Sequence, residues 1–256
     1  MSAAVPPHED TAVRLANIVG QSDAHLCSAS DAEALGVRMH RDAVGAFLKL
    51  QAAAHDAGFD LAILSGYRSF DQQLSIWNRK ATGQLAVLDN KARRVDIETL
   101  STEELVFSIL RWSALPGASR HHWGTDLDIY DMAAVPDDYV IELIPAEVNA
   151  GGMFAALHEW LDQRIAADEA FGFFRPYDID RGGIAPERWH LSYGPVASEY
   201  ARSLTRDLLR TTVQRADMRL KDTVLAHFDT IFDRFVMNTN QPALGGPGSF
   251  VTSPNA

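Results

Sequence analysis

Apolar residues recur at helical spacing along much of the chain. Residues 42–55 carry apolar side chains near one helical stripe and run towards Gly58, which predicts a core helix. The stripe consists of Val44, Phe47, Leu48 and Leu50. Residues 70–80 and 153–167 show the same spacing, and Ser101 with Glu104 has the spacing of a capping box before a helix of about three turns. After Gly194 the pattern is helical again through about residue 236.

Other segments have the pattern of strands. Residues 61–66 form a short apolar run that ends at a glycine. Residues 125–131 alternate, so Leu127 and Ile129 should face the core while Asp126, Asp128 and Tyr130 share the other face. Residues 171–177 and 187–193 are two further strand candidates, separated by a glycine-rich turn. These patterns predict an α+β fold: a small, mostly antiparallel sheet flanked by helices, with a C-terminal helical extension.

The same patterns divide the chain into regions. We expect an N-terminal segment at 1–39, with 1–10 a loose terminus, then a core domain at 40–195, a helical extension at 196–236 and a flexible tail at 237–256. Residues 80–96 form a polar connection too long for a simple turn, which makes them a candidate lid over a binding site.

Composition and charge narrow the class of protein. The chain has 256 residues, 46% hydrophobic and 22% charged, as in soluble globular proteins. Its 23 Lys and Arg against 34 Asp and Glu give a net charge of −11, which argues against nucleic-acid partners and anionic membranes. No apolar run has the ~18 residues of a membrane span. The first residues do not read as a secretory signal, so the location stays open: cytoplasmic, or periplasmic if a leader was removed. The oligomeric state is not predicted.

Three segments concentrate residues that can carry chemistry: 65–70, 119–128 and 187–190. They supply His121, Asp128 and His190, and two imidazoles with one carboxylate are a common three-ligand set for catalytic zinc. Glu187 precedes His190 by three positions and could activate a water molecule as an acid/base group. In a regular strand Glu187 and His190 would face opposite ways, so we expect Glu187 at a turn just after Pro186.

These motifs resemble those of the zinc D-alanyl-D-alanine carboxypeptidases of the vancomycin-resistance type, part of a group that includes lysostaphin and the sonic hedgehog signalling domain. The motif residues are Ser119, His121, Gly124 and Asp128, then Glu187, Trp189 and His190, with Ser65-Gly66-Tyr67-Arg68-Ser69 upstream. The resemblance covers roughly residues 40–195. It implies Zn²⁺ held by His121, Asp128 and His190, a catalytic base at Glu187, and an arginine, Arg68, that engages substrate or polarises the scissile carbonyl.

Further substrate contacts are expected from the same motifs, at Tyr67, Gln73, Ser119 and Trp189, beside Arg68. Ser119 is expected to position groups by hydrogen bonding rather than to act as a nucleophile. Asp126 departs from the family pattern, which often has a small residue two positions before the metal aspartate. A second carboxylate there could alter charge, metal preference or substrate.

The remaining histidines are interpreted as structural or surface residues. We expect His122 to face solvent, because adjacent side chains of an extended segment point apart. His158 and Glu159 resemble the start of a helical zinc motif, but Asp162 stands where its second histidine would be, so we expect a surface helix face. Five others are assigned to the core or the surface: His8, His25, His40, His55 and His227.

The sequence therefore predicts a zinc-dependent peptidase acting on peptidoglycan-type peptides, specifically a carboxypeptidase that releases a C-terminal D-amino acid. Two alternatives stay open: an endopeptidase that cuts inside a wall peptide, and a non-catalytic binding domain that keeps zinc for structure. D,D against L,D specificity is not predicted.

Overall fold

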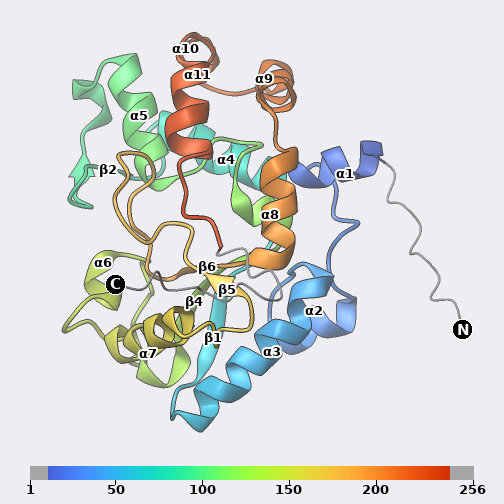
Figure 1. Cartoon of the computed structure of the whole chain (residues 1–256). Coiled ribbons are helices and arrows are strands. Elements are labelled where there is room, and N and C mark those ends of the chain that lie inside the picture. Colours follow the sequence, from blue (N-terminus) through green and yellow to red (C-terminus); the bar gives the residue numbers. More distant parts are fainter. Residues whose placement is uncertain (1–10, 243–256) are drawn as a thin grey trace, which may run out of the picture.

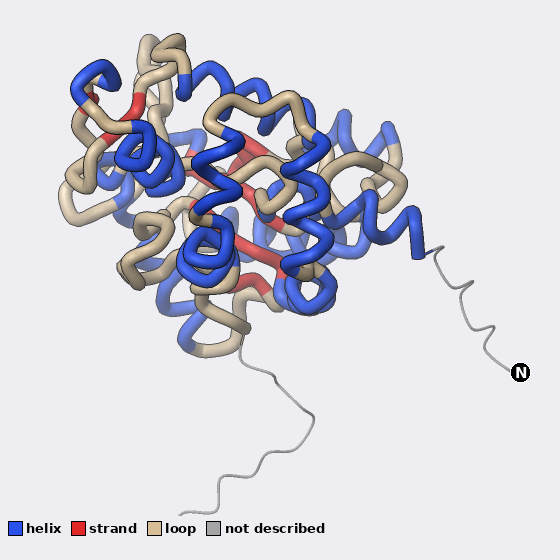
Figure 2. Tube along the Cα trace, turned by 90° about the horizontal axis from the view of Figure 1, so that it is seen from above, coloured by secondary structure: helices blue, strands red, loops and turns tan. Residues whose placement is uncertain are grey.

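A four-stranded antiparallel sheet lies at the centre of the protein, with strand order β1-β4-β6-β5 (Figure 1). The computed structural model describes residues 11–242. The strands are β1 (Leu61–Ser65), β4 (Asp126–Asp131), β6 (His190–Tyr193) and β5 (Phe173–Phe174). Each falls in a segment predicted as a strand, although β5 and β6 are shorter than predicted. Helices surround this sheet when it is seen from above (Figure 2), which confirms the α+β class.

The two faces of the sheet differ in chemistry. Leu127 and Ile129 of β4 and Leu191 of β6 are fully buried in one hydrophobic cluster, as the alternation predicts. The opposite face carries polar side chains, and the strand register brings them together. Asp128 stands opposite His190 on β6 and, past a bulge in β1, opposite Ser65. Three strands thus contribute to one polar row.

Helices α3 (Arg41–Asp56) and α7 (Ala155–Ala166) cover the apolar face, with α2 (Ala29–Leu35) and α6 (Pro145–Val148) beside them (Figure 1). The helix predicted at 42–55 is confirmed as α3, but its buried stripe is Ala43, Phe47, Leu50 and Ala54. Leu48, predicted in that stripe, is 48% exposed because it lies about 100° round the helix from Phe47.

A second set of helices packs on the other side of the molecule. It comprises α1 (Thr11–Ile18), α4 (Phe70–Ala81), α5 (Thr102–Trp112), α8 (Gly194–Ser203), α9 (Arg206–Arg215), α10 (Lys221–Ala226), α11 (Phe228–Ile231) and the π-helical segment η4 (Phe232–Val236). The predicted helical character through residue 236 is confirmed. Trp77 of α4 shares one hydrophobic cluster with Leu209 and Phe228, and its indole N–H donates to the carbonyl of Arg219 at 2.9 Å, so the C-terminal helices and α4 belong to one core.

Local signals explain where α4 and α5 begin. Ser69 and Gln72 form a capping box at α4, and Ser101 and Glu104 form the predicted one at α5. Between the two helices, the polar connection at 80–96 folds partly into a hairpin of β2 (Val87–Leu88) and β3 (Arg94–Val95). Three short 3₁₀ segments complete the chain path: η1 (Ile97–Thr99), η2 (Arg120–Trp123) and η3 (Met132–Ala134).

The structure corrects the placement of His158. The sequence pattern predicts this residue on a surface helix face, yet its side chain is fully buried, because it shares the inner stripe of α7 with Leu157 and Leu161. Burial, with the charges of Arg175 and Arg188, lowers the pKa of His158 to about 2. His158 is therefore a neutral core residue.

Some predictions concern regions that the structure does not test. His8 and the loose terminus at 1–10 lie outside the described residues, as do residues 243–256 of the predicted tail. The domain boundaries stay predictions. Within residues 11–242, none of the helices has both the length and the apolar character needed to cross a membrane.

Candidate metal centre

Three side chains converge on the polar face of the sheet. His121, Asp128 and His190 are buried, and one ligand atom of each lies within 4.8 Å of those of the other two. The Nε2 atom of His121 lies 3.3 Å from Oδ2 of Asp128, and Nδ1 of His190 lies 3.3 Å from Oδ1 of the same carboxylate. The structure thus brings together the three residues that the sequence proposes as ligands.

The backbone explains why residues distant in sequence meet here. Asp128 and His190 are direct cross-strand partners on β4 and β6. His121 lies in η2, the 3₁₀ turn that Gly124 ends with a positive φ of 64°. A Cβ atom at Gly124 would come within 2.7 Å of the backbone nitrogen of His40, so both the turn and its close packing require glycine.

Hydrogen bonds orient both imidazole rings. The Nδ1–H group of His121 donates to the carbonyl of Gly66 at 2.8 Å, which leaves its Nε2 facing Asp128. The Nε2–H group of His190 donates to Asp126 at 2.9 Å. The remaining nitrogen of His190, Nδ1, is buried and faces the carboxylates of Asp128 at 3.3 Å and Glu187 at 3.4 Å. Two imidazole lone pairs and a carboxylate therefore face one point, and this donor set fits Zn²⁺.

Asp126 is fully buried and serves as the partner of His190 rather than as a fourth member of the cluster. Arg120 donates to it at 2.7 Å, and the hydroxyls of Thr125 and Ser192 donate at 2.7 and 3.0 Å. Burial alone would raise the pKa of Asp126, but the Arg120 charge and the bond from His190 outweigh it and hold that pKa well below its usual range. Asp126 is thus an anion that fixes the ring of His190.

The charges inside the cluster are strongly coupled. Burial acts to raise the pKa of Asp128, but the charges and hydrogen bonds of His121 and His190 hold it well below its usual range. Burial acts in the opposite sense on His190, while hydrogen bonds to Asp126, Asp128 and Glu187 raise its pKa well above the usual value. In the absence of a cation, the His190 ring therefore holds a proton at the site. A divalent ion that binds there would displace this proton.

Glu187 lies beside this cluster, at a turn. Its backbone N–H donates to the carbonyl of Tyr177 at 3.0 Å, and its own carbonyl accepts from the backbone N–H of His190 at 3.1 Å. The chain turns at residues 188–189 before β6 begins, as expected for a residue just after Pro186. One carboxylate oxygen of Glu187 is consequently 3.4 Å from Nδ1 of His190.

A cavity of about 250 Å³ opens in front of these residues. Arg68, Ser119, Glu187 and Trp189 line it together with the three cluster residues. Of the predicted substrate contacts, Arg68, Ser119 and Trp189 are therefore at the cavity. The other two are not.

Gln73 and Tyr67 do not line the cavity, so their predicted contacts with substrate stay predictions. Gln73 is fully buried, accepts a hydrogen bond from Arg68 at 2.9 Å and donates to the carbonyl of Ala114 at 2.7 Å, so it positions Arg68. The hydroxyl of Tyr67 donates to the carbonyl of Ser22 at 3.2 Å, and its ring packs edge-on against His25 outside the cavity.

The sequence predicts that His122 faces solvent, and that prediction is wrong. Its side chain is fully buried, because η2 is a helical turn in which adjacent side chains do not point to opposite sides. Its Nδ1–H donates to the carbonyl of Arg68 at 2.7 Å, and its Nε2 accepts from the N–H of Gly117 at 3.1 Å. Burial lowers the pKa of His122 to about 3, so the ring is neutral and ties the Arg68 backbone to η2.

Several cavity residues are not indicated by the sequence motifs, and three of them carry polar groups that bear on the chemistry. Lys80, Tyr177 and Glu142 line the cavity from α4, from the segment after β5, and from the segment before α6. Only Lys80 carried a usable signal, since Gln73, Trp77 and Lys80 fall on one stripe of a helix. The ring of Tyr177 meets that of His190 edge-on at 5.0 Å, a contact between segments that no local pattern predicts.

Known proteins that are similar to this chain include D-alanyl-D-alanine carboxypeptidases. A family profile described as VanY, D-alanyl-D-alanine carboxypeptidase, matches residues 36–196. A D-alanyl-D-alanine carboxypeptidase of Enterococcus faecalis is 27% identical over 183 residues, covering 69% of this chain and 54% of that protein. An uncharacterized protein of Haemophilus influenzae is 30% identical over 124 residues, covering 48% of this chain and 93% of that protein. The solved structure of VanYB in complex with D-alanine-D-alanine is similar at 21% identity and a TM-score of 0.47, over 77% of this chain and 92% of that chain.

Proposed function

This chain belongs to the VanY family of D-alanyl-D-alanine carboxypeptidases, and from that premise we propose how its own residues release a C-terminal D-amino acid from a peptidoglycan-type peptide. The single observation that carries the proposal is the buried cluster of His121, Asp128 and His190 with Glu187 beside it. The family favours the carboxypeptidase over the endopeptidase and over a non-catalytic binding domain.

His121, Asp128 and His190 would hold the zinc ion through Nε2, a carboxylate oxygen and Nδ1. When bound, zinc supplies a Lewis acid that polarises a carbonyl group and makes a water molecule more acidic. Asp126 accepts from Nε2–H of His190 and so keeps this ring in the tautomer whose Nδ1 lone pair faces the metal site.

Glu187 is the proposed acid/base group. Its carboxylate lies 3.4 Å from a ligand atom, and the turn that holds it keeps only 13% of the side chain exposed. From there it would accept a proton from the attacking water and return it to the departing amine. Its position at the cavity wall gives it access to both groups.

Arg68 is the proposed partner of the developing negative charge. Its guanidinium donates to two neutral acceptors, Gln73 at 2.9 Å and Ser65 at 3.3 Å, so its positive charge is not compensated by either. His122 and Gln73 hold the residue from its backbone and its side chain. A fixed, uncompensated cation at the cavity wall suits an oxyanion.

The test is a panel of defined peptides ending in D-Ala-D-Ala, in a single D-Ala, or containing internal crosslinks, with products identified by mass spectrometry. We expect a free D-amino acid; two peptide fragments would instead indicate an endopeptidase. Glu187→Gln should lower kcat by about 10²- to 10⁴-fold while the protein still binds zinc. The control is Glu159→Gln on the exposed face of α7, which should behave like the wild type. Full activity of purified Glu187→Gln would refute its role.

A further inference from the structure

Lys80 is a cation of the cavity that the steps above do not use. It lies in the last turn of α4, on the same stripe as Gln73 and Trp77. Gln73 holds Arg68 and Lys80 lines the cavity, so these two positions of α4 face the site. Lys80 is about 10 Å further along the helix axis than Gln73 and lines the cavity wall together with Arg68 and Glu187.

The ammonium group of Lys80 has no partner in the described part of the chain. Neither a hydrogen bond nor an ion pair within 4.0 Å joins it to any of residues 11–242. Burial lowers the pKa of Lys80, while the carboxylate of Glu187 opposes this shift and the guanidinium of Arg68 adds to it. The amine thus lies in the electrostatic field of both groups. An acceptor supplied by a ligand would offset its partial loss of water.

The charged groups around the cavity have a net positive charge once a divalent ion is bound, which favours an anionic ligand. Arg120 is neutralised by Asp126. A divalent ion would offset Asp128 and Glu187. Arg68 and Lys80 then remain as two positive charges, against the single carboxylate of the exposed residue Glu142. A peptide with a free C-terminal carboxylate complements this imbalance, and a peptide without one does not.

We propose that Lys80 is a specificity-determining residue that binds the C-terminal carboxylate of the peptide, so that Arg68 remains available for the oxyanion. This inference rests on the proposed function and refines it. It gives a physical reason for cleavage at the chain end, since a peptide that continues past the scissile bond offers Lys80 no carboxylate.

The experiment compares two substrates and two variants. The substrates are one peptide ending in D-Ala-D-Ala and the C-terminal amide of the same peptide. If the amide is not cleaved, its affinity is measured as the inhibition constant for competition with the free-acid peptide. In Lys80→Met we expect kcat/KM for the free acid to fall about 10- to 100-fold, mainly through KM, with little change for the amide. Lys80→Arg should restore most of the loss, because it keeps the cation.

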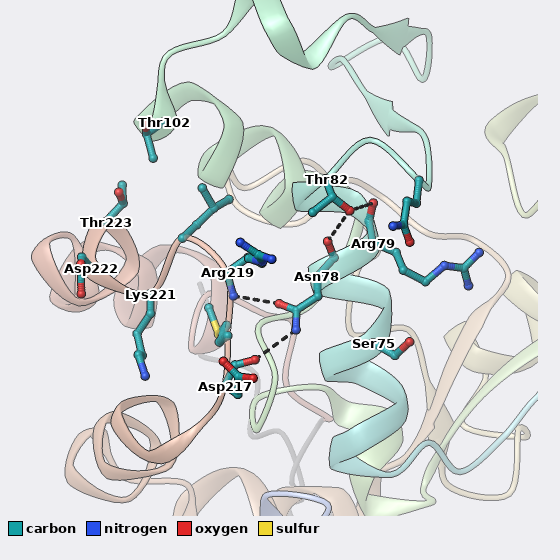
Figure 3. Close-up of a pocket in the computed structure, with 13 residues that line it drawn as sticks. Ser75, Asn78, Arg79, Thr82, Thr102, Asp217, Arg219, Lys221, Asp222 and Thr223 are labelled. Carbon is teal, nitrogen blue, oxygen red and sulfur yellow. Dashed lines mark hydrogen bonds between the residues drawn. The ribbon is translucent and has the colours of Figure 1, made fainter.

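Arg79→Met is the matched control. Arg79 is the preceding residue of α4, but it is exposed and lines a different cavity, between α4 and residues 217–223 (Figure 3). In this variant kcat/KM for the free acid, and kcat/KM or the inhibition constant for the amide, should equal the wild-type values. An equal loss for acid and amide in Lys80→Met, or no loss for the acid, would overturn the inference. If the wild type cleaves none of the peptides, the proposed function fails, and this is a separate result.

Discussion

Asp126 offers a sharp test of how the site is held together. In Asp126→Asn the amide oxygen can still accept from His190 and Arg120, and the amide N–H groups can donate to the hydroxyls of Thr125 and Ser192. The side-chain volume is unchanged, so no cavity forms. What disappears is the negative charge that polarises the His190 ring and neutralises a buried guanidinium.

Two magnitudes follow from this geometry. Removing the partner of a hydrogen-bonded histidine ligand typically weakens metal binding about 10- to 100-fold. Arg120 is only 6% exposed, and leaving such a buried charge unpaired costs about 3–5 kcal/mol of unfolding free energy. The stability effect is the larger one, so the two quantities must be measured separately: unfolding in urea without metal, and zinc affinity by competition with a chelator on folded protein.

Asp131→Asn is the matched control, because Asp131 is another buried aspartate of β4. Its carboxylate accepts from the backbone N–H groups of Asp60 at 2.9 Å and Ala133 at 3.2 Å, away from the cavity. It should lose stability and keep its zinc affinity. If Asp126→Asn binds zinc within about twofold of the wild type, or if both variants lose affinity equally, the orienting role of Asp126 is refuted.

Three further predictions concern the whole molecule. Burial lowers the pKa of His25 and of His40 to about 4, so each stays neutral in the folded state while the unfolded chain takes up protons from pH 6.5 downwards. The free energy of unfolding should therefore fall by about 3 kcal/mol for each of these two histidines as the pH drops from 6.5 to 4. Urea titrations at several pH values should show a smaller fall in His25→Gln than in the wild type. The same dependence on pH in both proteins would contradict this. Gly20→Ala should lower the free energy of unfolding by about 1–3 kcal/mol, because Gly20 has a φ of 77° and a Cβ there would lie 2.4 Å from Nδ1 of His122. It should also lower activity, because that nitrogen donates to the carbonyl of Arg68. Wild-type thermal stability and activity in this variant would argue against that link. Zinc at 100 times its dissociation constant should stabilise the fold by about 2.7 kcal/mol, and thermal unfolding with and without a chelator should show it; equal melting temperatures would exclude a metal bound only by the folded state.

The parts of the fold that could be predicted are those governed by local pattern. The alternation in residues 125–131 places Leu127 and Ile129 in the core and Asp126 and Asp128 on the other face, as observed. The capping box of Ser101 is equally local. Such features depend only on neighbours in sequence, so they can be read without knowing the tertiary structure.

The errors arise where tertiary structure decides. An extended backbone would place His122 in solvent, whereas the 3₁₀ turn η2 buries it. The family resemblance implies a substrate contact for Gln73, whereas the packing of α4 buries its side chain, which accepts from Arg68 and does not line the cavity. Lys80 reaches the cavity only because α4 is placed against the sheet, and helix packing of that kind leaves no short motif.

The pairing of Asp128 with His190 also makes metal binding depend on the strand register. A slip of one residue between β4 and β6 would turn the His190 ring into the hydrophobic layer and expose Leu191 in its place. In the slipped register the site would lack His190, and two ligands would remain for the ion. Zinc affinity therefore distinguishes the correctly paired sheet from a slipped one, because only the native register supplies all three ligands.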